Sequence, residues 1–328
     1  MSNNVDVSVL MSVYNETEAE VTESIESLLK QTYQNFEIII VNDNPKSEVN
    51  KNLLEKICLM DPRIRVINNA ANMGLALSMN EAAKHARGIY FARMDADDVC
   101  YPERLQRQMD VIKTGEYDLI CSGFVHIDEA SNPMPEKDSK DFRYTPEMIK
   151  ETLPYKSIIH HPTVVMTRDI FDKVGGYRNF PCSQDYDLWL RMLYADARFY
   201  IVPEPLIQYR IRSGSISVSK RLRQKLTIEY IRDLYVERLR KGKDSFSQEN
   251  YQRYLKKYIQ EEQKQTALIN ESDVDLSRAN QMIRGGNKVG GLLLKMKVFC
   301  FNPVYRHVFS KLLVKKYEIK YLQRKLKK

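Results

Sequence analysis

Residues 88–98 read GIYFARMDADD, an apolar run followed at once by three acids, Asp95, Asp97 and Asp98. The run has the length and composition of a buried β-strand. Like charges repel, so carboxylates held this close together need a cation or hydrogen bonds to offset the repulsion. Alternate side chains at a strand end can point into one cleft, where hard carboxylate oxygens suit Mg²⁺ or Mn²⁺. The alternative is a solvated acidic turn, the commoner role of an isolated motif of this kind.

The sequence before this stretch alternates between strand and helix patterns. We expect strands over residues 5–15, 36–43, 63–68 and 88–94, and helices over 18–32, 49–60 and 75–86. The run FEIIIVND (36–43) is apolar almost throughout, which is typical of a parallel strand covered on both faces. Alternation at this spacing predicts a doubly wound α/β sheet, and such sheets bind ligands beyond the carboxyl ends of their strands.

Beyond about residue 115 the pattern loosens. Strands are expected over 117–127 and 163–168, and a helix over 186–195. Residues 199–212 (FYIVPEPLIQYRIR) predict two short strands parted by Pro203 and Pro205, because proline cannot donate a ladder hydrogen bond. After residue 220 the pattern is nearly all helical.

The net charge of +8 conceals a division along the chain. Residues 1–219 hold 24 Lys and Arg against 32 Asp and Glu, a net charge of −8, whereas residues 220–328 hold 27 against 11, a net charge of +16. This asymmetry predicts two functional units, 1–219 and 220–328, with the second facing something anionic.

The composition also bears on the compartment. No run of about 18 uncharged apolar residues is present, so we expect no membrane-spanning helix. The first residues, MSNNVDVSVLMSVYN, lack the charged and then apolar pattern of a signal peptide. Five cysteines, an odd number without metal-binding spacing, indicate reduced thiols in a cytoplasmic protein.

Polar residues also follow the first two predicted strands and one helix start. The stretch SVYNE (12–16) and Asp43 could line a nucleotide pocket, with Tyr14 stacking and Asp43 accepting hydrogen bonds from a base edge. Otherwise Asp43 and Asn44 only form the turn before Pro45. Gly74 lies at a loop-to-helix junction, where a backbone can approach a ligand or a helix can simply begin.

Two later motifs carry groups that can move protons. The stretch SQDYDLWLR (183–191) offers Asp185 and Asp187, either of which could act as a general base. The alternative role is that of an acid at a helix N-terminus, where the dipole favours negative charge. The pair His160 and His161 is more often structural than catalytic.

These stretches occur together and in order, and as a set they resemble a known family. VSVLMSVYNE, SIESLLKQTYQNFEIIIVNDN, NMGLALSMN, RMDADD, HHPTVVM, GGY and QDYDLWLRM are similar to the inverting glycosyltransferases of family 2, which have the GT-A nucleotide-sugar-binding fold. The resemblance covers roughly residues 5–215. It implies a GT-A catalytic domain over 1–219, a mainly helical region over 220–328, and a role in making bacterial surface glycans or glycoprotein glycans.

The resemblance implies a reaction and a role for each matching residue. A hexosyltransferase of this kind moves a sugar from a nucleoside diphosphate, with UDP the expected nucleotide, to a hydroxyl of a glycan acceptor, and an α-linked donor gives a β-glycoside. Asp97 would bind Mn²⁺ or Mg²⁺, and Asp185 would be the catalytic base. Donor-binding residues would be Ser12, Tyr14, Glu16, Asp43, Gly74, Arg93, Asp95 and Arg212, and acceptor or sugar contacts would be His161, Gln184 and Trp189.

The sequence departs from the family pattern at two positions. Gln184 stands where the family often has Glu, which should alter acceptor contacts more than the base. Arg212 stands near the place of a metal-binding His. A cation is a poor metal ligand, so His160 or His161 compensates, water fills the site, or Arg212 binds the diphosphate directly; we expect the last.

The resemblance does not extend to residues 220–328, which mix Leu, Phe and Tyr with dense positive charge. One interpretation is an interfacial segment on anionic lipid, which suits a lipid-linked acceptor at the inner face of the cell membrane. Another is a helical bundle that packs on the catalytic domain or forms an oligomer, and a third is a module that holds a protein-linked glycan. Nucleic acid is not an expected partner, because no nucleic-acid motif accompanies the charge.

Two functions of other classes remain open at this point. The chain could be a non-catalytic module that binds a sugar nucleotide or a membrane. It could also be a phosphotransferase that forms an aspartyl-phosphate on Asp95, because DADDV fits that motif. Such an enzyme carries its acids after the first strand, whereas here they follow the fourth.

Overall fold

The computed structural model describes residues 5–135, 142–212, 221–259 and 262–326. The chain divides into two compact units, Met1–Arg212 and Ser213–Lys328. The boundary predicted at 219/220 falls in the stretch 213–220, which lies outside the described residues.

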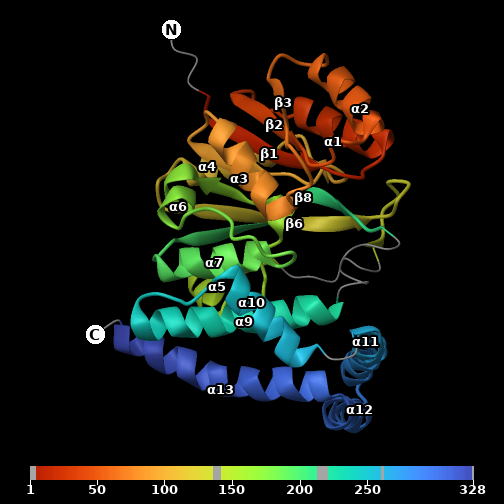
Figure 1. Cartoon of the computed structure of the whole chain (residues 1–328), viewed down its shortest axis with the longest axis vertical. Helices are drawn as coiled ribbons and strands as arrows, with labels where there is room; N and C mark the ends of the chain where they lie inside the picture. Colours follow the sequence, from red (N-terminus) through yellow and green to blue (C-terminus); the bar gives the residue numbers. More distant parts are fainter. Residues whose placement is uncertain (1–4, 136–141, 213–220, 260–261, 327–328) are drawn as a thin grey trace. The chain divides into compact units, whose positions relative to one another are not determined.

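The first unit is built on one mixed sheet. Within the described residues the sheet has eight strands, in the order β3-β2-β1-β4-β7-β6-β8-β5 (Figure 1). The strands are β1 (Val7–Val13), β2 (Phe36–Asn42), β3 (Ile64–Asn68), β4 (Tyr90–Arg93), β5 (Val99–Cys100), β6 (Leu119–Ile127), β7 (Val165–Thr167) and β8 (Phe199–Arg210). β1 to β4 run parallel, β7 is antiparallel to β4 and β6, and β8 is parallel to β6. The predicted doubly wound α/β sheet is confirmed, and the antiparallel β7 makes it a mixed sheet.

Helices cover both faces of this sheet. They are α1 (Glu18–Leu29), α2 (Glu48–Cys58), α3 (Leu75–His85), α4 (Arg104–Ile112), α5 (Pro146–Thr152), α6 (Arg168–Lys173) and α7 (Gln184–Tyr194), with a short 3-10 helix at His161–Thr163. Apolar side chains of α1, α2 and α4 form one core with alternate residues of β1 and β2, while α3 packs on the same two strands without joining that core. Burial on both faces explains the continuous apolar sequence of β2.

β8 differs from the prediction. It is one strand of 12 residues rather than two short strands. Its register against β6 shifts around Gly123, so that Pro203 and Glu204 form a bulge in the ladder. A Cβ on Gly123 would lie 2.7 Å from the carbonyl oxygen of Pro203, so only glycine fits opposite the bulge. The strand therefore continues as far as Arg210, beside the acids that follow β4.

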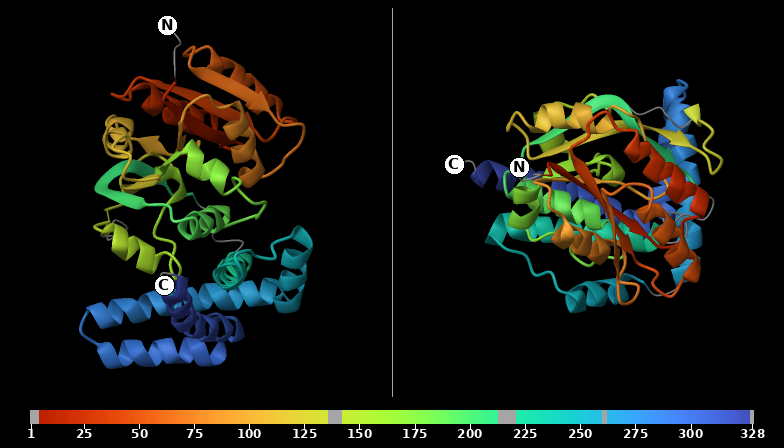
Figure 2. Two further views of the ribbon diagram at one scale, coloured as in Figure 1. Left: turned by 90° about the vertical axis from the view of Figure 1, so that its left-hand side faces the viewer. Right: turned by 90° about the horizontal axis from the view of Figure 1, so that it is seen from above.

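The second unit is helical, as predicted. Its helices are α9 (Arg221–Lys241), α10 (Gln248–Tyr258), α11 (Glu262–Arg284), α12 (Lys288–Phe301) and α13 (Pro303–Leu326), shown in teal to dark blue in Figure 2. Buried Lys315 joins α13 to α9 through ion pairs to Glu229 at 3.0 Å and Asp233 at 2.8 Å. None of the helices in the described ranges is both long and apolar enough to cross a bilayer.

Candidate active site

The parallel strands β1 to β4 bring their carboxyl ends to one edge of the sheet, and polar side chains gather there. At the end of β1 the carboxylate of Glu16 accepts hydrogen bonds from the backbone N–H groups of Tyr14 (2.7 Å) and Asn15 (3.2 Å). The side-chain amides of Asn44 and Asn50 donate to the carbonyl of Tyr14 at 3.1 and 2.9 Å. Glu16, Asn44 and Asn50 thus hold the backbone of the turn at Tyr14. The ring of Tyr14 remains 44% exposed and can stack on a ligand.

Ser12 is half-buried near the end of β1, and Asp43 directly follows β2. Asp43 is buried, and its carboxylate accepts three hydrogen bonds: from the side chain of Asn69 (2.7 Å) and from the backbone of Met73 (2.8 Å) and Gly74 (2.9 Å). In this structure Asp43 therefore fixes the loop 69–74, a role that the sequence did not predict. Any contact of Asp43 with a base edge would come in addition to these bonds.

Gly74 occupies a position that requires glycine. Its φ of +82° lies in the left-handed region, which side chains other than glycine rarely adopt. A Cβ there would meet nothing within 4 Å, so the backbone faces open space at the start of α3. This geometry is consistent with the predicted close approach of a ligand.

The acids after β4 alternate in exposure. Asp95 and Asp97 are half-buried, while Ala96 between them and Asp98 after them are buried. Asp95 is paired with buried Arg93, whose other terminal nitrogen donates to the carbonyl of Met94. The alternation places two of the three carboxylates on the accessible side, as a strand end predicts.

Asp98 and Arg210 hold the acidic turn in place. A carboxylate oxygen of Asp98 accepts the backbone N–H of Arg210 at 2.9 Å, and the Arg210 side chain donates to the carbonyl of Asp97 at 2.6 Å. The same guanidinium donates to Glu23 of α1 (2.6 Å) and to Ser131 (2.9 Å). Arg210 thus ties α1 and the turn after β6 to the carboxyl end of β4.

Arg212 lies next to Asp97. Its Nε is 3.0 Å from Oδ2 of Asp97, and one of its terminal nitrogens is 2.8 Å from Oε2 of Glu20 in the first turn of α1. Burial, together with the charges of Asp95 and Glu16, raises the pKa of Asp97 to about 7 even though Arg212 opposes the shift. The negative charges of Asp95 and Glu16 therefore affect the pKa of Asp97 more than the positive charge of Arg212 does.

The residues present fit a hard divalent cation. Asp95 and Asp97 offer carboxylate oxygens on the accessible side, and these are the ligands that hard divalent cations prefer. Within the described residues, no group of three or more His, Cys, Asp and Glu is placed to bind a metal. Mg²⁺ and Mn²⁺ sites need no such group, because phosphates and water commonly complete them.

α7 brings one of its two first-turn acids to the same edge. Asp185 is half-buried. Burial, aided by the charge of Asp95, raises its pKa to about 6, although backbone N–H groups at the start of α7 and the charge of Arg93 oppose the shift. Asp187 is buried and engaged elsewhere, accepting the Nε–H of Arg191 at 2.8 Å and lying 3.4 Å from Arg178. Of the two predicted bases, only Asp185 is available to a ligand.

Three predicted acceptor contacts lie deeper. His161 is buried beside Tyr177, whose hydroxyl is 2.7 Å from Nε2, and burial together with Arg93 holds the pKa of His161 well below its usual range, so the imidazole is neutral. Gln184 is buried at the start of α7. Trp189 is 0% exposed and packs toward His161, with 6.2 Å between ring centroids. A direct sugar contact requires an exposed face, which this indole does not have, so Trp189 is a core residue here.

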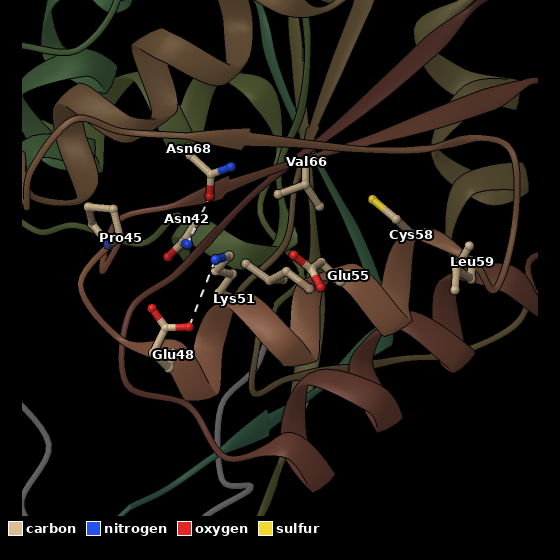
Figure 3. Close-up of a pocket in the computed structure, with 10 residues that line it drawn as sticks. Asn42, Pro45, Glu48, Lys51, Glu55, Cys58, Leu59, Val66 and Asn68 are labelled. Carbon is tan, nitrogen blue, oxygen red and sulfur yellow. Dashed lines mark hydrogen bonds and ion pairs between the residues drawn. The ribbon is translucent and has the colours of Figure 1, made fainter.

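A separate hollow of about 620 Å³ lies at the outer edge of the sheet, between α2 and the ends of β2 and β3 (Figure 3). Asn42, Asn68, Glu48 and Lys51 line it among others. The predicted site residues, including the acids beyond β4 and Asp185, are not among the residues that line it.

The sequence analysis did not identify the residues that hold the predicted site residues in position, namely Arg210, Glu20 and Asn69. Arg210 could have been found, because in YRIR it lies two residues before Arg212 on a predicted strand and so on the same side. Glu20 carries a weaker signal as the capping-box partner of Thr17. Asn69 carries none, since its contact with Asp43 depends on the path of the whole loop.

Known proteins are similar to this chain in sequence. The profile of glycosyl transferase family 2 matches residues 8–175. An uncharacterized glycosyltransferase of Methanocaldococcus jannaschii is 36% identical over 225 residues, covering 68% of this chain and 77% of that protein. The O-antigen biosynthesis glycosyltransferase WbnJ of Escherichia coli is 32% identical over 217 residues (65% and 82%), and the amylovoran biosynthesis glycosyltransferase AmsE of Erwinia amylovora 30% over 217 residues (65% and 79%).

Solved structures show the same fold. The crystal structure of S. aureus TarS residues 1–349 with UDP-GlcNAc superimposes with a TM-score of 0.58 at 16% identity, covering 97% of this chain and 92% of that one. At this identity the likeness concerns the fold alone.

Proposed function

Because the chain belongs to glycosyltransferase family 2, we propose that it moves a sugar from a UDP-sugar to a hydroxyl of a glycan acceptor, with inversion at the anomeric carbon. The observation that carries this proposal is the meeting of Asp95, Asp97 and Asp185 at the carboxyl edge of the sheet, where electrostatic influence links Asp185 to Asp95 and Arg93. The UDP-GlcNAc complex of TarS supports the choice of nucleotide.

In this proposal Asp185 is the general base. It takes the proton of the acceptor hydroxyl as that oxygen attacks the anomeric carbon from the side opposite the leaving diphosphate. In-line attack inverts the configuration, so an α-linked donor gives a β-glycoside. A pKa of about 6 suits this task, because the group is ionised at neutral pH and yet more basic than an ordinary aspartate.

Around the leaving group, Asp97 would hold Mn²⁺ or Mg²⁺ against the diphosphate, and Asp95 would contact the donor. When bound, the cation would offset the charge that develops on the departing diphosphate. Arg212 is paired with Asp97 and Glu20, and in this proposal it would turn to the diphosphate once Asp97 takes the cation. Tyr14 would stack on the base, and Asp43 would hold the loop that carries Gly74 against the donor.

Other observations bear on the acceptor and the compartment. Relatives named for O-antigen and amylovoran biosynthesis support a surface polysaccharide as the product. None of the five cysteines, all within the described residues, forms a disulfide, which accords with reaction in the reducing cytoplasm. A phosphotransferase is disfavoured, because the acids follow β4, the fourth strand of the sheet, and because Asp95 is paired with Arg93.

The direct test is a screen of the full chain against nucleotide sugars. We expect at least one UDP-sugar to raise the melting temperature with Mn²⁺ and to lose this effect with EDTA. The same donor should release UDP when a glycan acceptor is supplied. No shift and no release across UDP-, GDP- and dTDP-sugars would contradict the proposal, and phosphate trapped on Asp95 would favour the phosphotransferase.

Asp43→Asn should weaken donor binding about tenfold. The amide nitrogen of asparagine would face N–H groups that now donate to a carboxylate, and the loop 69–74, which carries Gly74, would be held less well. Donor affinity by calorimetry measures the effect. Asp61→Asn is the matched control: Asp61 also accepts three hydrogen bonds, all from Arg63, but it precedes β3 at the opposite edge of the sheet. Both variants should lose about 1–3 kcal/mol of stability. Equal donor affinity in the two would refute the role of Asp43.

A further inference from the structure

The second unit carries an apolar stripe that the transfer reaction does not use. Apart from Phe301 (80%) at its last position, the exposed apolar residues of α12 are Val289 (72%), Leu292 (56%), Leu293 (61%) and Met296 (62%), and exposed Cys300 continues the series. Their spacing of three and four residues places them within an arc of about 100° on a helix of 3.6 residues per turn. They form one continuous face, named here the α12 stripe (Val289, Leu292, Leu293, Met296 and Cys300).

The opposite face of α12 explains why this stripe is exposed. Gly291 and Val298 are the buried residues of the helix. A Cβ on Gly291 would lie 2.5 Å from the Ile283 side chain and 2.6 Å from the carbonyl of Ala279, so α12 packs closely on α11 through that face. Figure 2 shows α11 and α12 side by side, joined by a short turn. The stripe lies on the side of α12 that α11 does not cover.

Positive charge borders the stripe on both sides. At 100° per residue, Lys297 falls beside Leu293 on one border, and Lys288 and Lys295 fall beyond Leu292 on the other. Lys297 is 63% exposed although it lies 3.8 Å from Asp275 of α11. From Lys288 to the last residue the sequence holds 12 Lys and Arg and a single acid, Glu318.

An apolar face bordered by lysines, on a segment with this excess of positive charge, has the chemistry of a helix that lies in a bilayer interface. Apolar side chains enter the boundary between headgroups and acyl chains, while lysines stay at the level of the phosphates. A second copy of the same chain would bring 12 further cations to the same face, so the charge disfavours self-association there. We propose that the α12 stripe docks on the surface of an anionic lipid bilayer.

The test uses the full chain and vesicles of phosphatidylcholine alone or with about one phosphatidylglycerol in three. Flotation should recover the protein with the anionic vesicles and leave it behind with the neutral ones. Raising salt from about 0.1 M to about 1 M, which shortens the screening length from about 10 Å to about 3 Å, should weaken binding several-fold. Failure to float with anionic vesicles, or equal flotation with neutral ones, would overturn the proposal.

A pair of double variants locates the surface. Leu293→Glu with Met296→Glu should weaken vesicle binding at least about tenfold, because two inserted side chains are lost and two anions face the lipid phosphates. Val49→Glu with Leu59→Glu is the control, since these side chains are 70% and 89% exposed on and just after α2 of the first unit and make the same change in charge. The control should bind vesicles as the unaltered chain does.

Further measurements separate the remaining outcomes. All four substituted positions are exposed, so circular dichroism and melting temperature should be unchanged, and so should transfer to a water-soluble acceptor. Undiminished vesicle binding by the α12 variant would show that lipid docks elsewhere. A dimer by light scattering that this variant dissociates, without lipid binding by the unaltered chain, would assign the stripe to contact between copies.

Discussion

Asp185→Asn should lower kcat by at least about 10³-fold while donor affinity stays within a factor of about two. The substitution removes the group that the proposed mechanism uses to take the acceptor proton, and it leaves the nucleotide contacts intact. Single-turnover transfer measures the first quantity, and calorimetry with the donor measures the second. Retention of full activity would remove Asp185 from the mechanism.

The same group sets the expected pH dependence. Only the ionised form can accept a proton, so kcat/KM for the acceptor should rise tenfold per pH unit below about 6 and level off above it, following the raised pKa of Asp185. Asp185→Asn should abolish this limb of the profile. A limb that persists in the variant would belong to another group.

The raised pKa of Asp185 also leads to a prediction about stability, which can be tested without an activity assay. Its pKa in the fold is raised from 3.8 to about 6, so between these pH values the native state binds more protons than the unfolded state, and stability falls as pH rises. At pH 7 the ionised group costs on the order of 2–3 kcal/mol, which the amide of an asparagine would not impose. The variant should therefore melt at a higher temperature than the unaltered chain at pH 7 and at nearly the same temperature at pH 4.

Asp187→Asn is the contrasting control on the same helix. Asp187 is buried against Arg191 and Arg178, so the substitution removes the carboxylate that faces both guanidinium groups and should cost about 3 kcal/mol of stability. We expect Asp185→Asn to lose activity and gain stability, and Asp187→Asn to lose stability. This pair of results would distinguish a catalytic acid from a structural acid two residues away.

The parallel half of the sheet could be predicted because burial on both faces leaves a strong sequence signal. FEIIIVN forms β2, and the acids of RMDADD follow β4 where strand ends meet. β8 could not be predicted in the same way, because its prolines signal a break. The bulge around Pro203 depends on Gly123 in a strand about eighty residues earlier, which no local pattern records.

In the candidate site too, contacts between distant segments could not be predicted from the sequence. Sequence pattern indicated that Asp43, Asp95, Asp97 and Asp185 stand at element ends, but not which partners they would have. Asp43 proves to be occupied by the loop 69–74, and nine of the 11 residues of α7 are buried, so the periodicity around Trp189 marks no outward face. Partners are set by the packing of distant segments, and therefore only the structure reveals them.

Asp97→Asn should abolish transfer, with a fall of at least about 10³-fold, and should also weaken the binding of both Mn²⁺ and donor. This pattern differs from that of Asp185→Asn, because loss of the cation removes part of the donor's own binding energy. Mn²⁺ binding to the enzyme without donor, followed by electron paramagnetic resonance, gives a readout that does not depend on turnover.

Two further variants test whether Asp97 itself binds the Mn²⁺. Asp98→Asn is the matched control, since the Asp98 side chain is buried, one of its oxygens accepts the backbone N–H of Arg210, and asparagine can keep that bond; Mn²⁺ affinity should be retained. Arg212→Met removes the cation 3.0 Å from Asp97 and should tighten Mn²⁺ binding several-fold, because two cations then no longer compete for one carboxylate. If the Asp97→Asn variant binds Mn²⁺ as well as the unaltered chain does, the metal lies elsewhere. Arg212, already paired with Asp97, would then be left as the cation that meets the diphosphate.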